Sequence, residues 1–396
     1  MKRLLLLVLS TVFSISLLCG CVNDEESKKE DVKLDYSDTY VFGQDRQNNL
    51  YRQSYTSTCE SEDGYYYLDK ESGFVYVIDK KTHKCQPLCN KSNCLHDKET
   101  SSDKKEKCNA FFGYDLCEDL VYYMNNLYYI DCTTVKDDEG EHTVYNFYKS
   151  SLDGTNRDKL MTLNNGNVDS FTVHRGFIYY TAEYIGDDFE GTAMYKVPVD
   201  GNVDDSKVML EYYKYEDIFV ENIMYYGNSI YLKIYDTLND RFYFIKYNLE
   251  NGKWKDLNKS LKTTVTDFVF FNDRIVFADE SYTELFDCDL NGENKKKVLD
   301  IPKPDKKEDK YYHPYSDGIN LIVATAGLSP VDEFMYYDSG YKLIGAYKMP
   351  FAFSPYGMCG SNAFIVNDED GNLCYIDMKE LSHKDKAECI YTFEEE

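Results

Sequence analysis

A short, strongly apolar segment recurs seven times along this chain of 396 residues, and it constrains the fold more than any other feature. Each copy follows a turn rich in Gly, Asn or Asp and precedes a second strand-like segment. Several copies then reach a turn such as Leu152-Asp-Gly-Thr-Asn156, in which Gly permits a tight hairpin. The copies start 42 to 62 residues apart, at 65–68, 127–130, 177–180, 230–233, 275–278, 321–324 and 363–366.

A period of about 45 residues with about four short strands is typical of a β-propeller blade. We therefore predict an all-β fold, a β-propeller of seven four-stranded blades over residues 39–396. Six or eight blades also fit if the terminal copies share a blade. The alternatives, a β-sandwich or a pair of barrels, do not explain so regular a spacing. The chain has 39 Tyr, and aromatic residues favour strands.

The formal net charge of −26 argues against a nucleic-acid partner, which requires a basic surface. Acidity of this kind is typical of a solvated protein in an exposed location. The alternative interpretation of the acidity is a surface that binds cations.

The N-terminus resembles a bacterial lipoprotein signal peptide. A basic start, Met1-Lys2-Arg3, precedes an apolar run over residues 4–18 that is shorter than the ~20 residues of a membrane span. Leu18-Cys-Gly-Cys21 then reads as a lipobox. We predict a signal peptide over residues 1–20 and lipidation of Cys21, which would hold the protein on the outer face of the cell membrane. An ordinary secretory signal is the alternative.

The stretch after Cys21 is charged and has almost no apolar residues. It cannot bury a core, so residues 21–38 are predicted to be a flexible acidic tether.

The widest gap between copies contains a Cys-rich insertion at about 85–112. Within it, Cys89, Cys94, His96 and Cys108 supply three thiols and one imidazole at close spacing. This is the ligand set of a structural Zn²⁺ site, and an insertion with little core of its own would benefit from a metal. We predict that these four residues bind zinc, with Cys85 as a substitute ligand.

Disulfides compete with the metal, because the predicted location is outside the cytosol. A redox or iron–sulfur site is a third interpretation. The 13 cysteines less Cys19 and Cys21 leave an odd number, so they cannot all pair.

The other cysteines lie singly in strand patterns, and most are predicted to be small buried side chains: Cys117, Cys132, Cys288, Cys359 and Cys374. Cys59 and Cys389 lie near the two ends of the repeat, where a disulfide would close the ring. His174 and His313 are predicted to have polar surface or turn roles.

The lipobox, the acidic tether, Pro87-Leu-Cys89, Cys94-Leu-His96 and Cys108-Asn-Ala110 together resemble a group of surface lipoproteins of low-GC Gram-positive bacteria. The repeats are similar to those of TolB-like and low-density-lipoprotein-receptor-like propellers. The resemblance spans nearly the whole chain. It implies the propeller and the location, and it implies no activity.

No nucleophile elbow, zinc-protease helix or phosphate-binding loop is present in the sequence. We therefore predict no catalytic residue and no cofactor other than zinc. The favoured function is a binding or scaffolding module for an envelope protein, peptide or glycan. The alternatives are a hydrolase or lyase with its site in the central funnel, and an accessory subunit of a transport or sensing complex.

Overall fold

The computed structural model describes residues 37–47, 57–137, 140–164, 167–186, 189–212, 218–303, 311–316, 320–326, 331–353, 363–368, 370–377 and 388–393. The predicted signal peptide, Cys21 and residues 22–36 of the tether lie outside these residues. Within the part of the chain that is described, no helix has the length and apolarity needed to cross a membrane.

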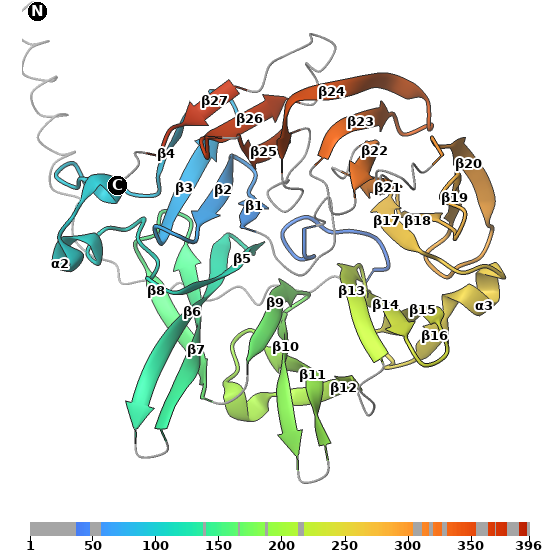
Figure 1. Ribbon diagram of the computed structural model, residues 1–396. Coiled ribbons are helices and arrows are strands. Elements are labelled where there is room, and N and C mark those ends of the chain that lie inside the picture. The colour runs from blue at the N-terminus through green and yellow to red at the C-terminus, as the bar shows by residue number, and fades with distance from the viewer. Residues whose placement is uncertain are drawn as a thin grey trace, which may run out of the picture. The chain divides into compact units, whose positions relative to one another are not determined.

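The described strands form seven antiparallel sheets, each from consecutive strands, arranged around a ring (Figure 1). Blade one contains β1 (Thr58–Glu60), β2 (Gly64–Asp69), β3 (Phe74–Asp79) and β4 (Cys85–Pro87). Blade two contains β5 (Leu116–Tyr123), β6 (Asn126–Asp137), β7 (Gly140–Ser151) and β8 (Arg157–Leu163). Blade three contains β9 (Val168–His174), β10 (Phe177–Gly186), β11 (Phe189–Pro198) and β12 (Lys207–Tyr212).

The second half of the ring continues this order. Blade four contains β13 (Ile218–Tyr226), β14 (Ser229–Asp236), β15 (Arg241–Asn248) and β16 (Trp254–Asp256). Blade five contains β17 (Asp267–Phe271), β18 (Arg274–Ala278), β19 (Glu284–Cys288) and β20 (Lys296–Asp300). Blade six contains β21 (Tyr311–Ser316), β22 (Leu321–Ala326), β23 (Val331–Tyr337) and β24 (Leu343–Phe353). Blade seven contains β25 (Ala363–Asn367), β26 (Leu373–Asp377) and β27 (Glu388–Tyr391).

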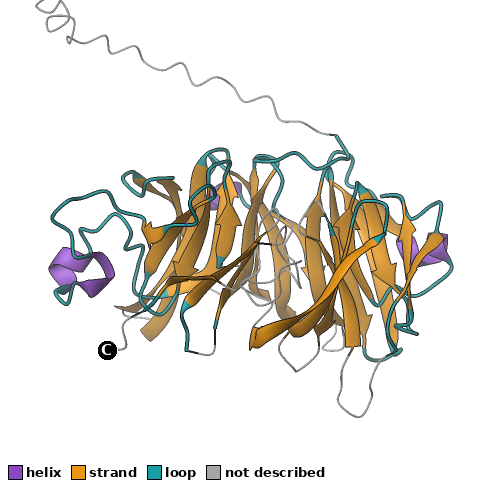
Figure 2. Cartoon of the chain, turned by 90° about the horizontal axis from the view of Figure 1, so that it is seen from above, coloured by secondary structure: helices purple, strands orange, loops and turns teal. Residues whose placement is uncertain are grey.

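The prediction of a seven-bladed β-propeller is therefore confirmed. Six sheets have four described strands, and the seventh has three. The segment before β25, at 354–362, is outside the described residues. Figure 2 shows the strands side by side along the ring, with loops and turns at both ends of the blades.

Burial explains why the repeated segments are apolar. The inner strands of each blade are covered on both faces by neighbouring blades, so a run such as Asp267–Phe271 is buried at every position. Outer strands meet solvent, and Lys296–Asp300 has no fully buried residue. Apolar clusters join the blades to their neighbours, and at the interface of blades six and seven Phe334 packs edge-on against Phe364 at 5.5 Å.

Four short helices interrupt the described strands. Two lie in the Cys-rich insertion, η1 (His96–Lys98) and α2 (Ser102–Lys105). The others are η2 (Val203–Asp205), which joins β11 to β12, and α3 (Leu257–Leu261), which follows β16.

Candidate metal centre and pocket

The Cys-rich insertion leaves β4 and folds through tight turns. The Cys89 N–H donates to the Pro87 carbonyl at 2.7 Å, and the Cys94 N–H donates to the Lys91 carbonyl at 3.3 Å. His96 then reverses the chain with φ of 56°, a left-handed conformation that is uncommon outside Gly. These local turns bring residues from a 20-residue stretch (89–108) to one point.

The four predicted metal ligands converge there. The Sγ atoms of Cys89, Cys94 and Cys108 and a ring nitrogen of His96 all lie within 4.8 Å of one another. Cys108 Sγ and His96 Nδ1 are 3.6 Å apart. Ligands at about 2.0–2.3 Å from a tetrahedral zinc ion are about 3.3–3.8 Å from each other, so a small contraction completes the coordination sphere. The structure thus places the four residues where they can bind one metal ion.

Backbone amides point at two of these sulfur atoms. Burial raises the pKa of Cys89. The hydrogen bonds from the backbone N–H groups of Lys91 and Asn109 and from the thiols of Cys108 and Cys94 outweigh burial, so the pKa lies below its usual value. The Ala110 N–H acts on Cys108 in the same way, although burial dominates and raises the pKa of Cys108 to about 12. Donors aimed at sulfur stabilise a thiolate, the form that binds metal.

Cys85, the predicted substitute ligand, does not join this group. It lies on β4 and packs against the apolar cluster of blade one. Burial, with the nearby charge of Asp97, raises the pKa of Cys85 to about 12, so it stays a thiol.

The insertion is fixed to blade two by Arg157 on β8. The Arg157 guanidinium donates to the carbonyls of Cys108 (3.1 Å), Asn109 and Phe111. The turn before β8 also packs closely against the insertion. A Cβ added to Gly154 in this turn would lie only 2.3 Å from the Asn109 carbonyl oxygen. The Asp-Gly turn seen in the sequence is therefore a structural contact of the insertion.

The insertion also reaches the place where the ring closes. Asp97, next to His96, accepts hydrogen bonds from Tyr76 of β3 (3.2 Å) and from Tyr391 of β27. Tyr391 and Phe393 pack into the cluster of blade one. The candidate metal centre therefore lies beside the junction of blades one and seven.

The predicted ring-closing disulfide between Cys59 and Cys389 is wrong. Cys59 is on β1, the first strand of blade one, whereas Cys389 is on β27, the last strand of blade seven, and is paired in register with Cys374. Neither residue forms a disulfide. Closure rests instead on aromatic packing and on Asp97.

A short segment ahead of blade one occupies the centre of the ring (Figure 1, blue loop). Asp45 is fully buried and forms an ion pair with the buried Arg175. Its Oδ2 atom also accepts the Gly227 N–H at 3.0 Å. The Arg175 N–H donates to the Gln44 carbonyl at 2.8 Å. Residues 37–47, here called the plug, are thus bound to the turns of blades three and four.

The predicted surface or turn roles of His174 and His313 are wrong, because both residues are buried. The Arg46 N–H donates to His174 Nδ1 (3.0 Å), and Nε2 lies 2.8 Å from the Gly227 carbonyl. Burial lowers the pKa of His174 to about 4, so it is neutral. Its Nδ1 atom is engaged by the plug and its Nε2 atom by the turn between β13 and β14, which leaves neither nitrogen for proton transfer.

His313 pairs with Asp267. The two side chains are on β21 and β17, the first strands of blades six and five, and His313 Nδ1 contacts Asp267 Oδ2. The ring of Tyr282 meets the imidazole edge-on at 5.4 Å.

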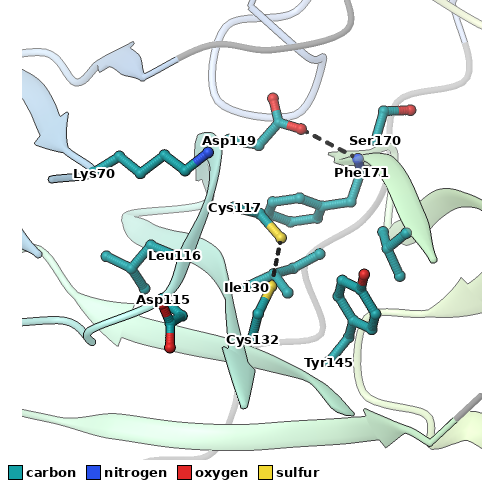
Figure 3. A pocket seen from close by; sticks show the side chains of 11 residues that line it. Lys70, Asp115, Leu116, Cys117, Asp119, Ile130, Cys132, Tyr145, Ser170 and Phe171 are labelled. Atoms are coloured by element: carbon teal, nitrogen blue, oxygen red, sulfur yellow. Dashed lines mark hydrogen bonds between the residues drawn. The ribbon is translucent and has the colours of Figure 1, made fainter. Parts of the chain in front are cut away.

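A pocket of about 470 Å³ lies beside blade two (Figure 3). Lys70 enters from the β2–β3 turn of blade one, and Ser170 and Phe171 come from β9 of blade three. The remaining lining belongs mostly to β5 and β6 and the residue before them: Asp115, Leu116, Cys117, Asp119, Ile130 and Cys132.

The sequence reasoning missed that Cys117 and Cys132 meet in this pocket. Their sulfur atoms are 3.0 Å apart, and both residues are only half-buried. The prediction of a single buried side chain holds for Cys288, and Cys374 is buried as predicted although it faces Cys389. The prediction is wrong for Cys117 and Cys132, and Cys359 is outside the described residues. The residues are 15 positions apart with no motif, so only the pairing of β5 with β6 reveals them.

Comparison with solved structures finds propellers at low sequence identity. A prolyl endopeptidase matches with a TM-score of 0.54 and 10% identity, over 84% of this chain and 49% of that one. A puromycin hydrolase matches at 0.49 and 10% identity, over 89% and 56%. The periplasmic gluconolactonase of Pseudomonas aeruginosa matches at 0.41 and 10% identity, over 84% and 91%.

These likenesses concern the fold alone. The chain spans about half the length of the prolyl endopeptidase. Neither the protein-family models nor the curated proteins contain a match. The molecule is thus defined by its architecture, a seven-bladed β-propeller, and by the two sites described above.

Proposed function

We propose that this chain is a lipid-anchored β-propeller outside the cytoplasm that serves as a binding module at the cell envelope. The pocket beside blade two is its ligand site. A zinc ion on Cys89, Cys94, His96 and Cys108 has a structural role.

The pocket is the observation that carries the binding role. Its volume of about 470 Å³ falls within the range of small-molecule sites. Its lining offers Lys70 and two carboxylates together with the rings of Tyr145 and Phe171. Such a lining suits a small ligand, or the end of a peptide or glycan, that carries both polar and apolar groups.

The contacts of the plug support binding over catalysis. Asp45 and Arg175 are engaged with each other, and His174 contacts the backbone of Arg46 in the plug and of Gly227 in blade four. They are not arranged to meet a substrate. A buried ion pair of this kind holds a segment in place, because removing one partner leaves an uncompensated charge.

The lipobox supports the anchor. Residues 22–36 separate Cys21 from the first described residue, and this stretch is acidic and poor in apolar side chains. We expect Cys21→Ser to move the full chain from the membrane fraction to the soluble fraction. Unchanged membrane retention would contradict the anchor.

The ligand site is tested by capture of envelope components on the immobilised full chain in detergent. Ser170→Trp fills the pocket, and Ser339→Trp places the same side chain on an exposed loop as a control. We expect the wild type and Ser339→Trp to capture a component that Ser170→Trp does not, with equal circular dichroism. The same captured set for all three proteins rules out the pocket as the ligand site.

One observation favours a second function, hydrolysis or elimination in the funnel. The buried His313–Asp267 pair resembles a base oriented by a carboxylate. Activity of the wild type on a panel of esters, peptides and uronides should then fall about 100-fold or more in His313→Gln. A wild type with no activity on the panel removes this alternative.

A further inference from the structure

Two thiols meet on neighbouring strands of blade two. Cys117 Sγ on β5 and Cys132 Sγ on β6 are 3.0 Å apart (Figure 3). A disulfide bond is about 2.05 Å long, so a shift of about 1 Å joins the two atoms. The Cys132 N–H donates to the Asp115 carbonyl at 2.6 Å, which ties the start of β5 to β6.

A β-bulge creates this arrangement. Leu116 pairs with Asp131 and Leu120 pairs with Tyr129, so residues 117–119 all lie opposite Ile130. Bulges bend a strand and redirect its side chains, and they are frequent next to functional sites. Here the bulge directs Cys117 toward Cys132 at the wall of the pocket.

The pair is accessible to a small molecule, unlike the single thiols of the core. Cys59 and Cys288 are 3% and 0% exposed, whereas Cys117 and Cys132 are half-buried and line the pocket. Cys374 and Cys389 also face each other, across β26 and β27, but they do not line this pocket.

The surroundings distinguish the two thiols. The hydrogen bond from Cys117 lowers the pKa of Cys132, against burial and the carboxylates of Asp131 and Asp115. The same hydrogen bond, then burial, raises the pKa of Cys117, and the charge of Asp119 acts in the same direction. Lys70 favours the thiolate at both positions. Cys132 therefore suits the attacking role and Cys117 the resolving role.

We propose that Cys117 and Cys132 form a thiol–disulfide exchange site whose substrate is a low-molecular-weight disulfide bound in this pocket. The Cys132 thiolate attacks one sulfur of the substrate RSSR, forms a Cys132–S–S–R bond and releases RS⁻. Cys117 then loses its proton, attacks Cys132 Sγ and releases the second RS⁻. Two protein thiols are oxidised and one RSSR is reduced to two RSH, which take up the two protons.

This activity goes beyond ligand binding at the envelope and does not depend on the lipid anchor. The pocket volume favours a small disulfide over a polypeptide, because about 470 Å³ accommodates a molecule of drug size. The reverse reaction, with a small thiol as reductant, returns the pair to its reduced form.

The test uses the reduced, zinc-loaded full chain and 2-hydroxyethyl disulfide as the probe. Free thiols are blocked with N-ethylmaleimide at intervals, and peptides are mapped by mass spectrometry. We expect a Cys117–Cys132 disulfide with release of two thiols per chain, and its reversal by 2-mercaptoethanol. Maleimide on both residues after prolonged exposure would overturn the proposal, as would a disulfide at this pair that the thiol does not reverse.

Variants assign the two roles. Cys117→Ser should accumulate the mixed disulfide on Cys132. Cys132→Ser should react with the probe at least about tenfold more slowly than the wild type. Cys59→Ser, at a buried single thiol, is the control and should react like the wild type. A Cys117→Ser protein without the mixed disulfide overturns the assignment, and the wild-type map decides the proposal if a variant does not fold.

A second arm tests the size of the substrate. A disulfide-bonded peptide replaces 2-hydroxyethyl disulfide at equal concentration. Slower reaction with the peptide supports a pocket for small disulfides, and about tenfold faster reaction overturns that choice of substrate.

Discussion

Two groups of thiols lie close together in the sequence and differ in what surrounds them. In the insertion, Cys89, Cys94 and Cys108 gather around His96, and backbone amides point at the sulfur atoms. In the pocket, Cys117 and Cys132 have only each other as sulfur partners among the described residues. Four ligands around one point suit a tetrahedral metal, whereas two thiols at an open wall suit exchange.

The difference teaches that the environment determines the use of a thiol. The insertion has little core of its own and is held by Arg157 and by Asp97, so a metal bound there would stabilise the junction of blades one, two and seven. The thiol pair lies in a blade that is already stabilised by its own strands and neighbours. Loss of the metal should therefore affect folding, and loss of the pair should affect chemistry.

The largest expected effect comes from removing a metal ligand. Cys94→Ala should reduce bound zinc from about one ion per chain to none, as measured by inductively coupled plasma mass spectrometry. The stability lost should be about 4 kcal/mol at free zinc about 1,000-fold above the dissociation constant. Cys288→Ala, at a buried single thiol, should keep its zinc. A wild type purified without metal would contradict the zinc site.

A methyl group at the turn that supports the insertion should have the next largest effect. Gly154 has φ of 71° and a Cβ would lie 2.3 Å from the Asn109 carbonyl oxygen, so Gly154→Ala should cost about 2–3 kcal/mol in urea unfolding. Gly371 has φ of 82° and nothing within 4 Å of a Cβ, so Gly371→Ala should cost only about 1 kcal/mol. Equal losses would show that the contact with the insertion adds nothing.

The ring junction should respond to loss of one hydroxyl. Tyr391→Phe removes a hydrogen bond to the carboxylate of Asp97, and we expect about 1.5 kcal/mol in the free energy of unfolding. Tyr235→Phe removes an exposed hydrogen bond to Asp240, and should cost less than about 0.5 kcal/mol. Thermal denaturation of both variants measures the two losses of stability. Equal losses would show that the hydrogen bond to Asp97 does not help to close the ring.

The thiol pair should change reactivity with little effect on stability. Because the hydrogen bond from Cys117 lowers the pKa of Cys132, a larger thiolate fraction persists as the pH falls. The rate of alkylation of Cys132 by iodoacetamide should then decline at lower pH than that of free cysteine, whose pKa is about 8.5. A pH–rate profile identical to that of free cysteine would contradict an activated thiol.

Asp131 provides the smallest test. Burial and the charge of Asp115 raise the pKa of Asp131 to about 6, so it is charged at neutral pH and opposes the Cys132 thiolate. Asp131→Asn should accelerate alkylation of Cys132 at pH 7 by about twofold to threefold, an effect of about 0.5 kcal/mol for a half-exposed charge. The gain should vanish below about pH 5, where Asp131 of the wild type is neutral.

The sequence by itself determined the repeat and hence the propeller, because each blade is a local unit of consecutive strands with its own apolar pattern. It also determined the four candidate metal ligands, since Cys89, Cys94, His96 and Cys108 are close enough in the chain for local turns to gather them. The Asp-Gly turn before Arg157 was recognisable as a hairpin for the same reason.

Only the tertiary structure decided the contacts between distant segments. The plug places Asp45 against Arg175, the last strand brings Tyr391 to Asp97, and strand pairing brings Cys117 to Cys132. It also buried His174 and His313, which looked like turn residues. Periodicity reports which face of a strand is covered, but the partner on that face depends on ring closure and on a bulge, and neither leaves a local pattern.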